Sequence, residues 1–442
     1  MIFFTQFKKA ISLLLILTTA LSLCLSLTSC SSGIGGSSAP ATKEELLLKM
    51  SEECDKEFDT VADYLDFWGF PLFSKSKIIT LERLYRKHFV EELSAPYEKA
   101  KITGNYFIEN FYTEEIKSTE ENTDLLIEAF VKTTGDKYSV YRTAEEYDDY
   151  DTDMSGSFVG IGVTVRYNTE ATEIYVEDVI IGGGAAEAGI LPGDYIIKVN
   201  GESVADIGYE KAVSNIKGEP NTKVSVTVKR GNEETTFTIV RREIIEQSAT
   251  CKIDGDVAYI KITGFKENTA SQFKDAIDEA ANSNVKGIIY DLRDNSGGYL
   301  HTVLEMLEYI APKGTALASF TNDYRDPAFS KTQHSVSLPA VVICNGETKS
   351  AAELFTAAIR DFQDMGLFEA TLVGEKTFGK GIMQNTYLFN DKSSITMTVA
   401  YYNPPCGVNY HGDGITPNVI VEDGDGDPQL AAAYSEIAKL IK

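Results

Sequence analysis

The feature that most limits the fold is a regular alternation of apolar runs and helical segments after Arg242. Apolar runs typical of buried strands occur at 257–262, 287–292 and 341–344. Helical patterns occur at 270–281, 300–310 and 350–361. This alternation predicts an α/β layer. Because sites in such sheets collect in the loops that follow the strands, these loops are the first place to look for chemistry.

The chain before this layer has a different pattern. From about Thr42 to Asp151, apolar residues recur every three or four positions, which predicts helices whose aromatic residues, such as Trp68, Phe70 and Tyr85, pack in a core. Near Ser155 the period changes to two, which predicts short strands. The chain is therefore expected to be a multidomain α+β protein, with a helical N-terminal region, a β-domain and an α/β core.

The first thirty residues read as an export signal. Lys8 and Lys9 precede an apolar run at 11–27, which is followed by Leu27-Thr28-Ser29-Cys30. The closing tetrapeptide resembles the bacterial lipoprotein signal, in which the cysteine is acylated, so Cys30 is the expected lipidation site. An uncleaved membrane anchor is the alternative. Both readings place the rest of the chain outside the cytoplasm, tethered to a membrane.

Composition excludes several classes of function. With 43% apolar and 24% charged residues the chain is not broadly disordered. A net charge of −25 argues against a nucleic-acid partner, which would require basic patches. Cys54, Cys251, Cys344 and Cys406 lack metal-ligand spacing, so no metal or cofactor is expected. Cys344 reads as core, and one disulfide remains open.

A glycine-flanked loop opens the β-domain. Successive backbone N–H groups in Gly160-Ile161-Gly162 can converge on an anion, and without an acidic side chain the loop suits a peptide's terminal carboxylate. Residues 155–242 resemble a PDZ domain, most specifically at 186–194 and 199–201. The resemblance implies a ligand strand between the edge at 161–165 and a helix at 209–216. The pocket for an apolar last side chain would be lined by Ala212, Val213 and Ile216. The alternative is a plain β-domain with tight glycine turns.

Two loops of the α/β layer suggest acyl-transfer chemistry. Gly297 and Gly298 follow the apolar run at 287–292, and paired glycines allow backbone N–H groups to face a cavity, as an oxyanion hole requires. Ser350 stands at the start of a helix, where the unpaired N–H groups stabilise developing negative charge. Ser350 and Glu353 also fit a capping box, which for this motif alone is the stronger interpretation.

A third loop places Lys380 between two glycines. Gly374, four further residues, Gly379 and Lys380 nearly match a P-loop, but Gly381 stands where a Ser/Thr hydroxyl must bind Mg²⁺. No nucleotide is therefore expected.

Together the three loops resemble the carboxyl-terminal processing proteases of the S41 type, which use a Ser/Lys dyad. The likeness spans 125–421, includes 136–141 and 412–417, and is most specific at Thr377-Phe378-Gly379-Lys380-Gly381. It implies a crotonase/ClpP-like core with Ser350 as nucleophile and Lys380 as base. Gln384 would hold the lysine, and N–H groups of Ala351 and of Gly297 or Gly298 would form the oxyanion hole.

The resemblance also divides the chain. The expected parts are a signal peptide (1–29), a Gly/Ser-rich tether (30–41), a helical region (42–152), a PDZ domain (153–243), a protease core (244–425) and a C-terminal helix (426–442). The expected function is an endopeptidase at the bacterial cell envelope that recognises accessible C-termini of unstructured proteins. The helical region is a candidate for homodimerisation.

Two alternatives stay open at this stage. A histidine base is the rival mechanism, with His88, His301, His334 and His411 as the only candidates and His301 nearest to the presumed site. A catalytically inactive, membrane-tethered peptide-binding scaffold is the rival function. The chain also departs from many relatives at Ser296 and Lys137, where they have proline, and at Lys349, whose charge beside the nucleophile is expected to change the local electrostatics.

Overall fold

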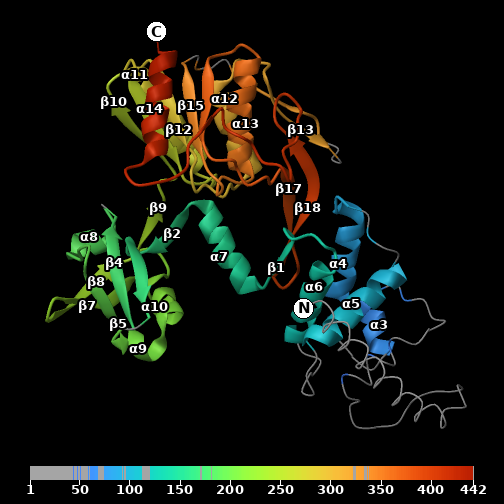
Figure 1. Ribbon diagram of the computed structural model, residues 1–442. Helices are drawn as coiled ribbons and strands as arrows, with labels where there is room; N and C mark the ends of the chain where they lie inside the picture. Colours follow the sequence, from blue (N-terminus) through green and yellow to red (C-terminus); the bar gives the residue numbers. More distant parts are fainter. Residues whose placement is uncertain are drawn as a thin grey trace, which may run out of the picture. The chain divides into compact units, whose positions relative to one another are not determined.

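The computed structural model (Figure 1) describes most of the chain after residue 60. The described residues are 60–67, 74–91, 96–111, 120–169, 172–180, 182–321, 325–332 and 338–441, with Lys43, Leu47, Met50, Phe58, Leu93 and Val336. The predicted export signal, Cys30, Cys54, Trp68, Phe70 and His334 lie outside them. Residues 53–112 and 116–442 belong to one compact unit, and the following description concerns that unit. No described helix is both long and apolar enough to cross a membrane.

The N-terminal part is helical, as predicted. It contains α3 (Val61–Phe67), α4 (Lys75–His88), α5 (Pro96–Phe111) and α6 (Glu120–Lys132). Tyr85 is buried and meets Phe130 edge to face, with ring centroids 5.2 Å apart. The prediction missed one strand here, β1 (Val140–Arg142), which pairs antiparallel with β18 (Ser394–Asn403). The N-terminal part thus contributes a strand to the sheet that contains β18.

Helix α7 (Ala144–Ser155) joins this part to the β-domain. It starts with a capping box between Thr143 and Glu146 and ends at Gly156, which adopts the left-handed conformation (φ 70°) that glycine tolerates. It carries no basic residue and six acidic ones. Its N-terminal acids suit the positive end of the helix dipole.

The β-domain is built around one antiparallel sheet in the order β3-β4-β5-β7-β8. Its elements are β2 (Ser157–Gly160), β3 (Val163–Asn168), β4 (Glu173–Val179), α8 (Gly184–Ala188), β5 (Tyr195–Val199), β6 (Glu202–Ser203), α9 (Val204–Ile207), α10 (Tyr209–Ile216), β7 (Lys223–Arg230), β8 (Glu233–Val240) and β9 (Arg242–Ile245). The period-two pattern of β7 puts Val224, Val226 and Val228 in the core. β3 lies at one edge of the sheet, and β2 pairs separately with β9.

The α/β core has the alternation predicted from sequence. Its sheet runs β10-β11-β12-β15-β16-β19, parallel from β11 onward. The strands are β10 (Ala249–Asp254), β11 (Val257–Ile262), β12 (Gly287–Asp291), β15 (Ala340–Cys344), β16 (Ala370–Gly374) and β19 (Val419–Ile420). The helices are α11 (Thr269–Asn282), α12 (Leu300–Ile310), α13 (Ala351–Asp364) and α14 (Pro428–Leu440).

Helices cover both faces of this sheet, as the upper part of Figure 1 shows. Ile289 of β12 packs with Ala433 and Ile437 of α14. The next residue, Tyr290, meets Phe355 of α13 edge to face at 5.3 Å. Successive strand residues point to opposite faces, so the continuous apolar run of β12 matches a strand buried on both sides.

A second sheet stands beside the core. β17 (Ile382–Leu388) and β13 (Ala316–Thr321) pair with β18, and β14 (Ala328–Phe329) pairs with β13. β1 and β17 pair with opposite sides of β18, and the segment before β1 contacts β17 through a hydrogen bond from Gln384 Nε2 to the Tyr138 carbonyl oxygen.

Candidate active site

The nucleophile candidate lies at the sharp passage from β15 to α13. Ser350 has φ 55° and ψ −119°, a region that a residue with a Cβ rarely occupies. The next residue, Ala351, begins α13, so the Ser350 side chain lies at the positive end of a fourteen-residue helix. Ser350 lines a cleft of about 790 Å³ together with Gly297, Gly298 and Lys380.

The capping box with Glu353 exists, but Glu353 does more than cap a helix. Its Oε2 accepts hydrogen bonds from the backbone N–H groups of Ser350 (3.0 Å) and Lys380 (2.7 Å). Its Oε1 accepts from the Thr377 hydroxyl and from the Gly379 N–H, both at 2.6 Å. Burial raises the pKa of this carboxyl, and the four hydrogen bonds oppose that effect. One fully buried carboxylate therefore joins the serine loop to the lysine loop.

The lysine candidate is held at a distance from the serine. Lys380 Nζ donates to Gln384 Oε1 at 2.8 Å, and Gln384 Nε2 donates to the Tyr138 carbonyl oxygen at 2.6 Å. The Tyr138 ring centroid lies 5.1 Å from the ammonium. Burial lowers the pKa of Lys380, as a lysine acting as a base requires.

Tyr402 occupies the space between the two loops. Its hydroxyl donates to the Lys380 carbonyl oxygen at 3.0 Å and lies 3.5 Å from Ser350 Oγ. Within the described part of the chain, Ser350 Oγ and Lys380 Nζ do not form a hydrogen bond with each other. The Lys380 side chain must therefore move before Nζ can accept the proton of Ser350 Oγ. Nothing in the sequence pattern had singled out Tyr402, and Tyr138 had been noted only as part of the matched segment 136–141.

The glycine loop favours one of the two predicted oxyanion donors. The Gly297 N–H already donates to Asn295 Oδ1 at 2.9 Å. The described residues offer no acceptor to the N–H groups of Gly298 and Ala351, which both line the cleft. Asn295 is fully buried, and its backbone carbonyl oxygen accepts a hydrogen bond from the Lys349 N–H at 2.9 Å. Asn295 thus ties the glycine loop to the nucleophile loop.

Glycine is required at both positions of this loop. A Cβ at Gly297 would lie 2.8 Å from the Ser350 Cβ, and one at Gly298 would lie 2.2 Å from the Phe265 carbonyl oxygen. Gly298 also has φ 142°, which strains any other residue.

No described histidine forms a hydrogen bond with Ser350. His301 lines the cleft, but it pairs with Glu267 at 3.0 Å and stacks on Tyr299 at 5.0 Å. His411 packs edge-on between Tyr138 and Tyr401, and burial lowers its pKa. His88 stacks on Tyr387. This arrangement favours structural roles for these three histidines.

Most of the predicted peptide-binding residues line one groove of about 240 Å³. They are Gly160, Ile161, Gly162, Val213 and Ile216. Ala212 is fully buried in the core of the β-domain and is not among the residues that line the groove. The Ile180 N–H donates to the Gly162 carbonyl oxygen at 3.0 Å. In the observed register this leaves the Val163 N–H pointing away from β4, on the free side of the edge strand.

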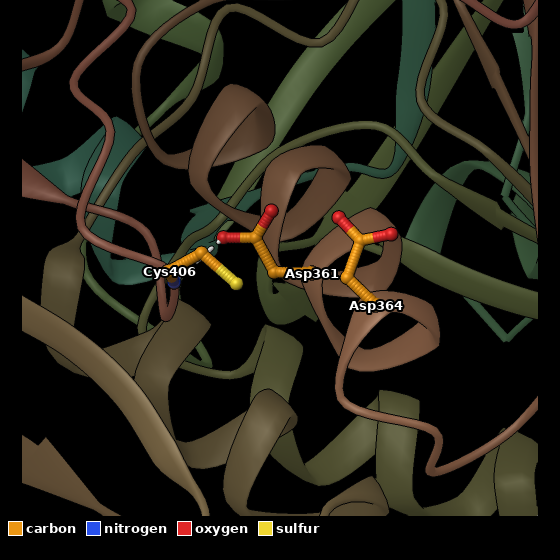
Figure 2. Close-up of side chains that lie close together, drawn as sticks. All are labelled: Asp361, Asp364 and Cys406. Carbon is orange, nitrogen blue, oxygen red and sulfur yellow. Dashed lines mark hydrogen bonds between the residues drawn. The ribbon is translucent and has the colours of Figure 1, made fainter.

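One group of side chains outside the cleft consists of residue types that can ligate a metal ion (Figure 2). Asp361 and Asp364 of α13 face Cys406 on a neighbouring loop. Asp361 already accepts hydrogen bonds from the Arg360 guanidinium and from the Cys406 N–H, at 2.7 and 2.9 Å. These bonds satisfy the buried carboxylate of Asp361, and the bond from the Cys406 N–H holds the loop of Cys406 against α13. The three described cysteines, Cys251, Cys344 and Cys406, are free thiols, and Cys344 is buried as predicted.

Comparisons with known proteins give matches for both the β-domain and the α/β core. Residues 256–421 match the family model of peptidase family S41, and residues 151–229 match that of the PDZ domain. A protein of Staphylococcus aureus (strain bovine RF122 / ET3-1) named "Probable CtpA-like serine protease" is 32% identical over 326 residues, 73% of this chain. The protein of the same name from Staphylococcus epidermidis (strain ATCC 12228 / FDA PCI 1200) is 33% identical over 310 residues, 69% of this chain.

The chain spans 64% and 62% of the lengths of these two relatives. A crystal structure of a candidate S41 protease from Bacteroides fragilis NCTC 9343 is 15% identical and has a TM-score of 0.50, covering 84% of this chain and all of that one. This likeness concerns the fold, and it confirms the predicted combination of a β-domain with an α/β core.

Proposed function

The chain carries a PDZ domain followed by a domain of peptidase family S41, and on that basis we propose that it is a serine endopeptidase with a Ser350/Lys380 dyad. One observation carries the proposal. A single buried carboxylate, that of Glu353, accepts hydrogen bonds from the backbone N–H groups of both Ser350 and Lys380. The proposed nucleophile and base therefore belong to one hydrogen-bonded unit.

The mechanism follows from the positions of these groups. Neutral Lys380 moves from Gln384 to Ser350 and takes the hydroxyl proton while Oγ attacks the peptide carbonyl carbon. The N–H groups of Gly298 and Ala351 stabilise the oxyanion. The lysine then gives its proton to the leaving amine. Water, deprotonated by the same lysine, attacks the acyl carbon; the bond between that carbon and Oγ breaks, and the lysine returns the proton to Oγ. Gln384 holds the free lysine in its waiting position.

The PDZ groove is proposed to capture the substrate's C-terminus as an extra strand on the free edge of β3. The free carboxylate would bind the loop at Gly160, Ile161 and Gly162. An amidated peptide, or one ending in Asp, should bind more weakly than the same peptide with a free apolar end. Equal binding of all three peptides would remove this part of the proposal. The domain limits 153–243 and 244–425 are part of the same proposal.

We further propose that the protein is exported and lipid-anchored through Cys30. The support is the sequence alone, a basic start, an apolar run and the tetrapeptide ending in Cys30. A clickable fatty acid fed to cells should label the wild-type protein but not Cys30→Ala. Equal labelling of both proteins would contradict the assignment.

Cleavage of an unfolded protein tests the dyad. Ser350→Ala and Lys380→Ala should each abolish cleavage while C-terminal peptide binding remains. Lys376→Ala is the matched control, since Lys376 is an exposed lysine of the same loop and its loss should leave cleavage intact. Cleavage by either dyad variant at the wild-type rate would refute the proposal. Peptide binding by a wild-type protein that cleaves nothing would favour the inactive scaffold.

A further inference from the structure

The PDZ groove has a chemically mixed lining. The edge of β3 and helix α10 contribute apolar side chains, Val163, Val165, Val213 and Ile216. Residues outside the PDZ sheet contribute three carboxylates to the same groove, Asp149 and Asp153 from α7 and Glu246 after β9. In a groove of about 240 Å³, these carboxylates are within reach of one long side chain bound against the apolar wall.

The cations near this groove only partly neutralise its carboxylates. Lys217 is the one basic residue among the described residues that line the groove, and its Nζ lies 3.6 Å from Asp149 with both side chains exposed (47% and 73%). Such exposed pairs are weak and exchange readily with other partners. Lys266 bonds both Asp153 (2.8 Å) and Glu246 (2.7 Å), so one ammonium is shared by two carboxylates. Asp149 is therefore the carboxylate most available to a ligand.

We propose that this groove selects peptides whose last residue is lysine or arginine. The inference rests on the proposed PDZ capture of C-termini and names its specificity. Lysine and arginine lay an aliphatic stem along apolar surface and keep the charged head at a polar rim, which is the combination that this lining offers. The head meets Asp149, and the peptide's terminal carboxylate replaces Asp149 as the partner of Lys217. An apolar last residue would contact the apolar wall but would form no ion pair with the carboxylates. The proposal therefore revises the expectation from sequence that the last residue of the ligand is apolar.

Peptide binding to the full chain carrying Ser350→Ala tests this selectivity, since bound peptides then stay intact. The probes are fluorescent peptides of one sequence that end in Lys, Arg, Leu or Asp, with an amidated Lys peptide as the fifth. The Lys and Arg peptides should bind roughly two- to five-fold more tightly than the Leu peptide in low salt, the range for one exposed ion pair. The advantage should shrink in about 0.5 M salt, because the Debye length falls to a few ångströms.

Charge changes at Asp149 identify the responsible group. Asp149→Asn should bring the Lys and Leu affinities together, and Asp149→Lys should make the Leu peptide the tighter ligand. Glu233→Gln is the matched control, because this exposed acid of β8 does not line the groove and its loss should leave the preference unchanged. A preference that survives Asp149→Lys would overturn the role given to α7.

The outcomes separate this inference from the proposed function. Leu binding as tightly as Lys in low salt overturns the selectivity and leaves PDZ capture standing. Equal binding of the amidated and free Lys peptides overturns capture of the carboxylate, and the selectivity falls with it. The protease assignment is tested separately by the loss of cleavage in the Ser350→Ala and Lys380→Ala variants.

Discussion

Replacing Glu353 by Gln tests whether one carboxylate really joins the two catalytic loops. The amide nitrogen fits best at the position of Oε1, where it can donate to the Thr377 hydroxyl oxygen. The oxygen then remains at Oε2 and keeps its bonds from the N–H groups of Ser350 and Lys380. Two buried donors then lose their acceptor, the Gly379 N–H and the Thr377 hydroxyl proton, which now donate to Oε1.

The expected cost follows from the loss of these two hydrogen bonds. A buried N–H without a partner costs about 1–3 kcal/mol, and the neutral amide recovers part of it because burial no longer opposes a charge. If the whole loss falls on the geometry of the site, kcat falls by roughly 5- to 150-fold. Glu353→Ala removes the acceptor of all four donors, so its free energy of unfolding should fall by roughly 3 kcal/mol or more.

The assay combines denaturant unfolding with steady-state cleavage of an unfolded protein. Activity should fall in the order wild type, Gln, Ala, while the affinity for a C-terminal peptide stays constant because the PDZ groove is unchanged. Glu347→Gln is the matched control. Glu347 is 65% exposed and pairs with Lys349, so its loss should change stability by less than about 0.5 kcal/mol. Wild-type stability and kcat in Glu353→Gln would refute the reasoning.

Three further predictions follow from contacts of the site and of its supports. Gly298→Ala should lose about 2–5 kcal/mol of stability and nearly all activity, from strain at φ 142° and the clash with the Phe265 carbonyl, measured by unfolding and by cleavage. Lys349→Gln should shift the rise of kcat/KM to higher pH, because Lys349 helps to lower the pKa of Lys380 and only neutral Lys380 is a base; an unshifted profile would contradict this. Lys77→Met should cost roughly 3–5 kcal/mol in unfolding experiments, since buried Lys77 pairs with Asp124 and Asp391 at 2.9 and 2.7 Å; a loss under about 1 kcal/mol would show that the pairs add little.

Strong local patterns made much of the fold predictable. The expected limits of β11 (Val257–Ile262), α10 (Tyr209–Ile216) and α12 (Leu300–Ile310) coincide with the structure, because long apolar periodicity is a local property of the chain. β1 was missed for the opposite reason. It is three residues long, and its partner β18 lies about 250 positions away, so only tertiary pairing makes it a strand.

The candidate site divides in the same way. Turn residues and the resemblance to S41 proteases singled out Ser350, Lys380 and the paired glycines, because glycine-rich turns and helix starts have characteristic local sequences. The preference for Gly298 over Gly297 came from a hydrogen bond between Gly297 and Asn295, and the acids in the PDZ groove came from helix α7 and from Glu246 after β9.

The sequence by itself determined the alternation of strands and helices in the α/β core, and it singled out the residues that are proposed to carry the chemistry. Only the tertiary structure decided that Glu353 serves both loops and that Tyr402 lies between Ser350 and Lys380. The physical reason is that these contacts join segments 20 to 30 residues apart or more. Which of them meet depends on which strands lie side by side, and periodicity along the chain does not encode that arrangement.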